Sequence, residues 1–193
     1  MNKNVIGIDI SHSAVSAVLV RSESGDRKIS AYARTVLADK DVWDCVAETL
    51  DVLRQKTDIA DAVCVAALPD YYLSYRTIIM PFADRRKIDK ISAYELEPLL
   101  PFSPDEALID FDVLSATAEG EENTEYAVLT AGIQKTRLAD WLAGFAGVGL
   151  DPELLIPRGM AAASVISFYN DNALFVDVDG AEVVTATVIN KTV

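Results

Sequence analysis

Apolar residues predict a β-hairpin near each end of the chain. Near the start, the apolar run at residues 5–10 contains one aspartate, Asp9, and a small polar turn separates it from a second apolar run. Near the end, the run at residues 174–178 contains Asp177 and leads through a turn into the apolar residues 183–189. Aligning Asp9 with Asp177 superimposes the two patterns. Each first strand is apolar at consecutive positions, which is typical of a strand that is buried on both faces and ends in a carboxylate.

The residues after the first hairpin predict one lobe of an α/β domain. A third strand is expected at residues 27–37, and Asp41 caps an amphipathic helix that extends to Lys56. The short apolar run at residues 62–68 is typical of a strand buried between helices. Three strands, a crossover helix and a buried parallel strand describe a ribonuclease-H-like lobe.

The middle of the chain predicts a small α+β unit. Its expected elements are a strand, a helix and two strands joined by an acidic loop, at residues 73–80, 84–97, 108–116 and 126–133, with the loop at 119–124. Pro98 ends the helix, because proline cannot continue the hydrogen-bond ladder. The main lobe then resumes with a helix, a strand and a helix at residues 136–146, 154–156 and 157–169.

Composition indicates a soluble protein that does not bind nucleic acid. The chain of 193 residues is 51% hydrophobic, which suffices for one or two domains with a core. No apolar stretch approaches the ~20 residues that span a bilayer, so we expect no membrane span. The net charge of −13 opposes nucleic-acid binding, which needs basic surface. Cys45 and Cys64 lie in apolar patterns and are expected to be buried thiols.

Charge is distributed unevenly in the middle of the chain. A basic cluster stands at the start of the expected helix: Arg85, Arg86, Lys87 and Lys90. No Lys or Arg lies between Lys90 and Lys135, where acidic residues are frequent and include Asp105, Glu106, Asp110 and Asp112. These charges describe either a solvated face or a polarised docking surface for a protein partner, on which charge steers the encounter.

Four motifs give the chain a family resemblance. They are the apolar run around Asp9, residues 75–82 (YRTIIMPF), residues 94–102 (YELEPLLPF) and the hairpin led by Asp177. Together they cover most of the chain, and the arginine strand followed by the Glu-x-Glu helix and Pro-Phe is the most specific part. The chain resembles the actin-like cytoplasmic region of the type II secretion protein GspL and the type IV pilus assembly protein PilM.

The resemblance implies a fold and a role. The implied fold is α/β with an α+β insert, a ribonuclease-H-like fold of the actin-type ATPases that is truncated after the first hairpin of a second lobe. Its parts are lobe one (residues 1–80 plus 134–172), the inserted subdomain (81–133) and that hairpin (173–193). The implied role is a scaffold on the cytoplasmic side of the bacterial inner membrane, which contacts platform proteins of type II secretion and recruits the secretion ATPase. The alternative is an ATP-binding, PilM-like pilus assembly protein, and a homodimer is also open.

The resemblance also identifies two phosphate turns, whose candidate cofactor-binding residues are Asp9, Ser11, Ser13, Asp177 and Gly180. In an actin-like site, small turn residues let backbone N–H groups approach phosphate oxygens, and the aspartate holds Mg²⁺ through water. Here Ser11 and Asp179 stand where the family has glycine, and no Lys or Arg lies in or beside either turn. A carboxylate that faces a triphosphate is unfavourable. We therefore expect a degenerate site with no catalytic residue, metal ligand, cofactor or enzyme activity. The alternative is that the site binds Mg-ATP. His12 is expected to be an exposed turn residue.

Overall fold

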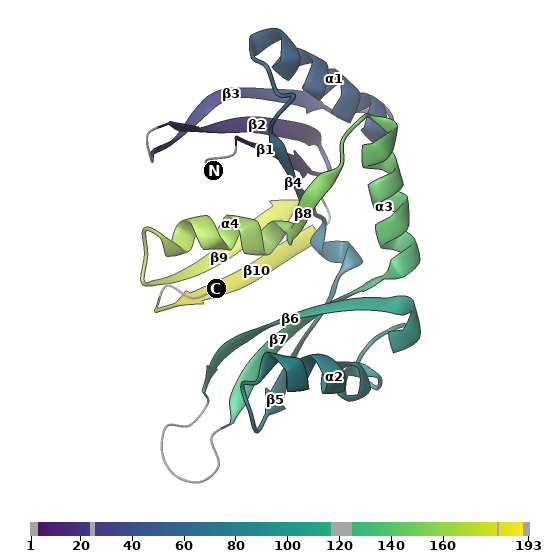
Figure 1. Ribbon diagram of the computed structural model, residues 1–193, viewed down its shortest axis with the longest axis vertical. Coiled ribbons are helices and arrows are strands. Elements are labelled where there is room, and N and C mark those ends of the chain that lie inside the picture. The colour runs from purple at the N-terminus through teal and green to yellow at the C-terminus, as the bar shows by residue number, and fades with distance from the viewer. Residues whose placement is uncertain (1–3, 24–25, 117–124, 181, 191–193) are drawn as a thin grey trace. The chain divides into compact units, whose positions relative to one another are not determined.

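The computed structural model describes residues 4–23, 26–116, 125–180 and 182–190 (Figure 1). The acidic loop expected at residues 119–124 lies outside these ranges. The chain divides into two compact units, Met1–Asp70 with Trp141–Val193 and Tyr71–Asp140. The second unit takes in residues 74–80, the strand that the sequence pattern places in the small α+β unit and the family resemblance places in lobe one. The division into a lobe, an insert and a further hairpin stays a prediction.

The first unit is built on a five-stranded mixed sheet in the order β3-β2-β1-β4-β8. The strands are β1 (Val5–Ile10), β2 (Ala14–Glu23), β3 (Asp26–Val36), β4 (Val63–Leu68) and β8 (Pro152–Pro157). β2 pairs antiparallel with both β1 and β3, whereas β4 pairs parallel with both β1 and β8. The three strands and the buried parallel strand expected from the sequence are confirmed.

Helices lie on both faces of this sheet (Figure 1). They are α1 (Val42–Lys56), α3 (Lys135–Gly147) and α4 (Arg158–Ser167). The Asp41 carboxylate caps α1, as expected, by accepting the backbone N–H groups of Trp43 and Asp44. On the same face, Trp43 packs edge-on against Trp141 and Phe145 of α3, with ring centroids 5.2 and 5.1 Å apart. α4 lies on the opposite face, so the sheet is a layer between helices.

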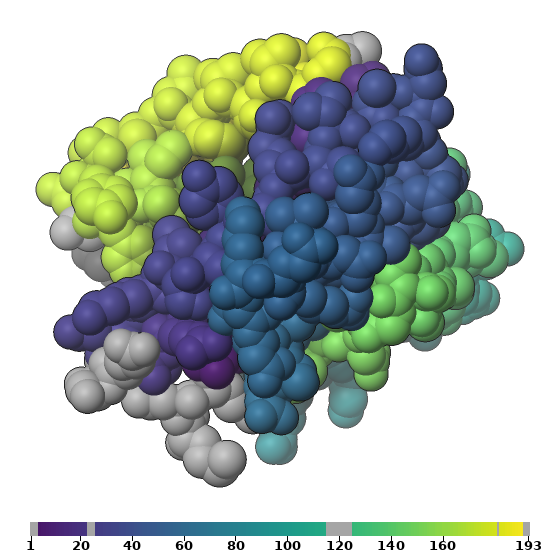
Figure 2. Space-filling view, turned by 90° about the horizontal axis from the view of Figure 1, so that it is seen from above, coloured from purple at the N-terminus to yellow at the C-terminus, as the bar shows by residue number. Residues whose placement is uncertain are grey.

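The second hairpin forms a separate antiparallel sheet of β9 (Asn172–Asp179) and β10 (Glu182–Ile189). Its inner face packs against α4 and buries Val188. Its outer face is open: Leu174 is 68% and Val178 67% exposed, and Figure 2 shows the yellow atoms of this hairpin at the surface. The expectation that its first strand is buried on both faces is therefore wrong for the described chain, because only one layer covers the hairpin.

In the second unit, one helix packs on a three-stranded antiparallel sheet in the order β5-β7-β6, which confirms the strand-helix-strand-strand pattern. The elements are β5 (Ser74–Met80), α2 (Arg85–Leu96), β6 (Ala107–Ala116) and β7 (Tyr126–Gln134), with short 3₁₀ turns at Asp70–Tyr72 and Pro104–Glu106. The core consists of Ile78, Met80, Ile88, Leu96 and Val128. Asp84 caps α2 by accepting the N–H groups of Arg86 and Lys87.

Two expectations drawn from composition can be compared with the structure. Cys45 and Cys64 are both buried free thiols, as their apolar surroundings predict. Among the helices of the described ranges, none combines the length and the apolar character that crossing a membrane requires.

Candidate functional site

The first candidate phosphate turn follows β1, and the hydroxyl of one of its own serines, Ser11, occupies its backbone groups. The Ser11 hydroxyl oxygen accepts the N–H groups of Ser13 and Ala14 at 3.3 and 3.0 Å. The same hydroxyl donates to the Ala14 carbonyl at 3.0 Å. A phosphate oxygen would have to compete with this hydroxyl for both N–H groups. Ser11 therefore closes the turn on itself.

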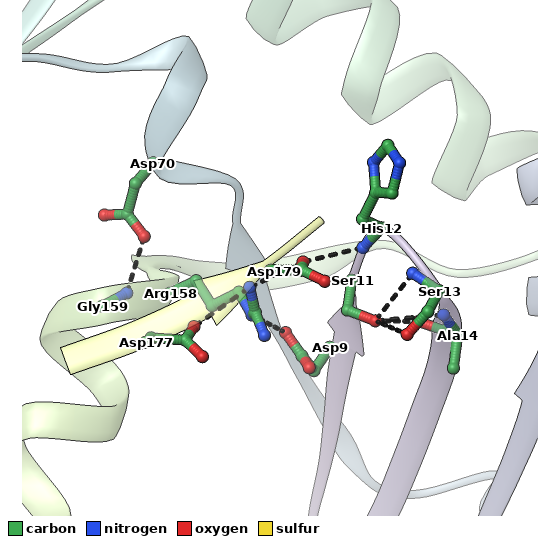
Figure 3. A network of polar contacts seen from close by, with 10 residues as sticks. All are labelled: Asp9, Ser11, His12, Ser13, Ala14, Asp70, Arg158, Gly159, Asp177 and Asp179. Atoms are coloured by element: carbon green, nitrogen blue, oxygen red, sulfur yellow. Dashed lines mark hydrogen bonds and ion pairs between the residues drawn. The ribbon is translucent and has the colours of Figure 1, made fainter. Parts of the chain in front are cut away.

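The second turn meets the first one directly. The Asp179 carboxylate accepts the backbone N–H of His12 at 2.7 Å (Figure 3). Gly180 follows with φ +64°, and a Cβ there would lie 2.6 Å from the His12 ring, so this position requires glycine for both reasons. His12 is exposed, as expected. The two turns of the repeated hairpin are thus joined by a carboxylate of the chain itself.

Arg158 lies at the centre of the site, and no sequence motif pointed to it. Its guanidinium Nη1 lies 2.8 Å from Asp179 Oδ2 and 3.1 Å from Asp177 Oδ2, and its Nε lies 3.2 Å from Asp9 Oδ1 (Figure 3). The side chain of Arg158 is 21% exposed and that of Asp179 15%. No basic residue is adjacent in sequence to either turn, yet the fold places a cation between both. We call these four residues the arginine–carboxylate cluster.

The electrostatics of this cluster are set by three carboxylates around one guanidinium. Burial raises the pKa of Asp9 above its ordinary value; the Arg158 charge lowers it, and the charges of Asp179 and Asp177 raise it further. Asp9 Oδ1 is buried, and its contact with Arg158 is an ion pair without hydrogen-bond geometry. Asp9 and Asp177 thus contact Arg158 as ion pairs only, whereas Asp179, with two hydrogen bonds, is the best satisfied carboxylate.

The position of Arg158 is fixed by the start of α4. Pro157 precedes the helix and offers no side-chain cap; instead the Asp70 carboxylate, which follows β4, accepts the N–H of Gly159 at 2.8 Å. Gly159 packs closely on β10, since a Cβ there would lie 2.5 Å from Val184 Cγ1. Strand β4 and the second hairpin thus hold the first turn of α4, and with it Arg158, at the cluster.

Mg-ATP does not fit the residues in this arrangement. Arg158 already neutralises the carboxylates that would hold Mg²⁺ through water, and Ser11 and Asp179 accept the N–H groups that would meet phosphate oxygens. The described residues contain no group of three side chains arranged to hold a metal ion. We therefore derive no chemical step from a nucleotide at this site.

The candidate partner surface lies entirely in the second unit. All of its members are exposed: Arg85, Arg86, Lys87, Lys90, Asp105, Glu106, Asp110 and Asp112. The fold brings its two signs of charge together at one point, where Arg85 Nη1 lies 3.1 Å from Asp112 Oδ1 and the guanidinium stacks 4.9 Å from the Phe111 ring. Within the described residues, no ion pair or side-chain hydrogen bond holds Arg86 or Lys90.

Comparison with known proteins places these features in a family. The sequence profile of the type IV pilus assembly protein PilM matches residues 7–174. A comparison with curated proteins gives no significant match. Among solved structures, a PilM–PilN type IV pilus biogenesis complex is similar with a TM-score of 0.79 and 19% identity, over 97% of this chain and 59% of that one. The cytoplasmic domain of EpsL, an inner-membrane component of the type II secretion system of Vibrio cholerae, has a TM-score of 0.63 and 14% identity, over 98% of this chain and 70% of that one.

The likeness to both structures confirms the actin-type α/β fold expected from the sequence. The chain spans 59% of the length of the PilM chain in that complex. Because the family profile covers most of the described sequence, the chain belongs to the type IV pilus assembly protein PilM family.

Proposed function

We propose that this chain is a non-enzymatic scaffold domain on the cytoplasmic side of a bacterial inner membrane, where it binds platform proteins of a pilus or secretion machine and recruits the assembly ATPase. The observation that carries the proposal is Arg158, whose guanidinium occupies the centre of the degenerate phosphate site. A domain whose site is filled by its own side chains acts through protein contacts. The PilM relative forms a complex with PilN, and the EpsL relative is an inner-membrane component, which agrees with this role.

The start of α2 is the surface that we assign to the ATPase. Arg85, Arg86 and Lys87 lie in its first turn, where the helix dipole disfavours positive charge. The Asp84 cap and the Asp112 carboxylate, which pairs with Arg85, offset this locally. Basic residues kept at an unfavourable position suit an acidic partner surface, because complementary charge raises the association rate and fixes the orientation. Arg85 also stabilises its own unit through Asp112, so Arg86 and Lys90 report more purely on binding.

The test is binding of the purified N-terminal domain of the assembly ATPase, measured by calorimetry. The variant carries Arg86→Glu and Lys90→Glu. Its matched control carries Arg27→Glu and Lys28→Glu, two exposed residues of β3 in the first unit, and changes the net charge equally. We expect ~10-fold weaker binding for the α2 variant only, with both variants melting near the wild-type temperature. Equal binding by the two folded variants would remove α2 as the ATPase surface.

Mg-ATP binding is the alternative to be tested, because Asp9 and Asp177 are both present and converge on one point, even though Arg158 occupies that point. Calorimetric titration of Mg-ATP into the protein distinguishes the two. Absence of heat from a well-folded sample supports the scaffold, whereas micromolar binding supports a nucleotide-dependent switch and contradicts the non-enzymatic assignment.

A further inference from the structure

We infer that Asp179 and Arg158 are a built-in substitute for a metal-bound phosphate, which keeps the two hairpin turns joined without any nucleotide. The inference rests on the proposed non-enzymatic role, but it concerns the cluster and not the partner surface of α2. It assigns Asp179 the part of the anion and Arg158 the part of the cation.

Asp179 meets the first turn as a phosphate oxygen would. Its Oδ2 atom accepts the His12 N–H at 2.7 Å, from a side chain that is only 15% exposed. Carboxylate and phosphate oxygens are both anionic acceptors, and backbone N–H groups of tight turns bind either one. Asp179, whose carboxylate makes the second turn unsuitable for a triphosphate, therefore supplies an anion of the chain's own.

Arg158 takes the part of the cation because of where its contacts lie. Asp9 and Asp177 occupy equivalent positions in the two copies of the hairpin, and the guanidinium lies 3.2 and 3.1 Å from them. With Asp179, three carboxylates converge on this guanidinium. Without it they would repel one another at short range. A divalent cation that draws their oxygens together would relieve this repulsion, although their arrangement around the guanidinium is not that of a metal site among the described residues.

Arg158 stays at the cluster because the contacts of the next residue hold its backbone in place. Asp70 holds the adjacent Gly159 N–H at 2.8 Å, and Gly159 packs on Val184 without room for a Cβ. The joined state is therefore the resting state of the chain.

The test removes the guanidinium of Arg158 and measures whether a metal ion can replace its charge. In Arg158→Gln, we expect a lower melting temperature that MnCl₂ raises by ~2–4 °C at constant ionic strength. The wild-type protein is expected not to respond to MnCl₂. The matched control is Arg85→Gln, which removes an arginine from a pair with a single carboxylate, Asp112, and should not respond either. Electron paramagnetic resonance of Mn²⁺ supplies a direct readout of binding.

A sign reversal provides the second measurement. Asp179→Asn should lower the melting temperature of the wild-type protein, because it weakens the contacts to His12 and Arg158. In the Arg158→Gln background it should raise the melting temperature, because it relieves repulsion among carboxylates. Arg158→Lys keeps the charge and provides a folded comparison if the glutamine variant does not fold; it should show no response to Mn²⁺.

Three results would overturn the inference. They are a melting temperature of Arg158→Gln equal to that of the wild type, a folded Arg158→Gln protein without Mn²⁺ binding, and destabilisation by Asp179→Asn in both backgrounds. None of these depends on the assembly ATPase, so failure of the α2 surface and failure of the cluster are separate outcomes.

Discussion

Gly144→Ala is the substitution for which the structure gives the clearest expectation. Gly144 lies in α3 beneath the Trp43 ring of α1, and a Cβ at this position would overlap Cε2 and Cζ2 of that ring and lie 2.6 Å from Cδ2. Trp43 must therefore leave its place. Doing so breaks its edge contacts with Trp141 and Phe145, whose ring centroids lie 5.2 and 5.1 Å away.

The magnitude follows from two opposing effects. Each aromatic edge contact contributes about 0.5–1.5 kcal/mol beyond area burial, so losing both costs about 1–3 kcal/mol. Alanine in place of glycine within a helix returns at most about 1 kcal/mol. The net expectation is a loss of about 1–2 kcal/mol in the free energy of unfolding. Gly147→Ala in the same helix meets no atom within 4 Å and should be neutral or stabilising.

The assay is equilibrium unfolding in urea, followed by circular dichroism and by intrinsic fluorescence. Both tryptophans of the chain, Trp43 and Trp141, belong to this cluster, so fluorescence excited selectively in tryptophan and not in tyrosine reports on it alone. Gly144→Ala should lower the unfolding midpoint and change the native emission. Gly147→Ala should neither lower the midpoint nor change the emission. Equal stability of the two alanine variants, with unchanged native emission, would refute the packing of α1 on α3.

Two further predictions concern α1 and the buried thiol. Asp41→Ala removes the cap that accepts the N–H groups of Trp43 and Asp44 and should cost about 1 kcal/mol in urea unfolding, whereas Asp39→Ala, at an exposed neighbouring position, should cost nothing measurable. Burial raises the pKa of Cys64 to about 11, so above about pH 9 the unfolded chain loses the thiol proton and the folded chain keeps it. The free energy of unfolding of the wild type should thus fall by up to about 3 kcal/mol relative to that of Cys64→Ala between about pH 9 and pH 11. The measurement is the difference between the unfolding midpoints of the two proteins at each pH. Parallel pH profiles would contradict the assigned burial.

Much of the fold follows from local sequence patterns. The two apolar runs of the N-terminal hairpin, the cap at Asp41 and the continuous apolar run that ends at Leu68 each depend on residues that are close in sequence. The small unit was also predictable, since Asp84 and Pro98 bracket its helix between strands. The exposure of the outer face of β9 was not predictable. Whether a strand face is buried depends on which layer covers it, and that is a property of tertiary packing.

The candidate site was predictable only in part. The carboxylates Asp9 and Asp177 were found because the hairpin is repeated, and Asp179 because it departs from the family pattern. The interpretation of Asp179 as a repulsive group was incomplete, since it considered only charges adjacent in sequence. Arg158 lies 19 residues before Asp177 in the chain, yet Nη1 is 3.1 Å from Asp177 Oδ2. A search confined to the turns could not find it.

Topology explains where such a cation can be found. A helix that leads by a short connection into a strand packed antiparallel against it brings its own first turn beside the end of that strand. α4 and β9 are connected in this way, so Arg158 at the start of the helix lies beside Asp177 and Asp179 at the end of the strand. Arg158 is also the only basic residue between Arg137 and Lys191 in the sequence. Three carboxylates that converge in a fold require a counter-charge, and a lone arginine at the start of the preceding helix is the residue that this connection can deliver to them.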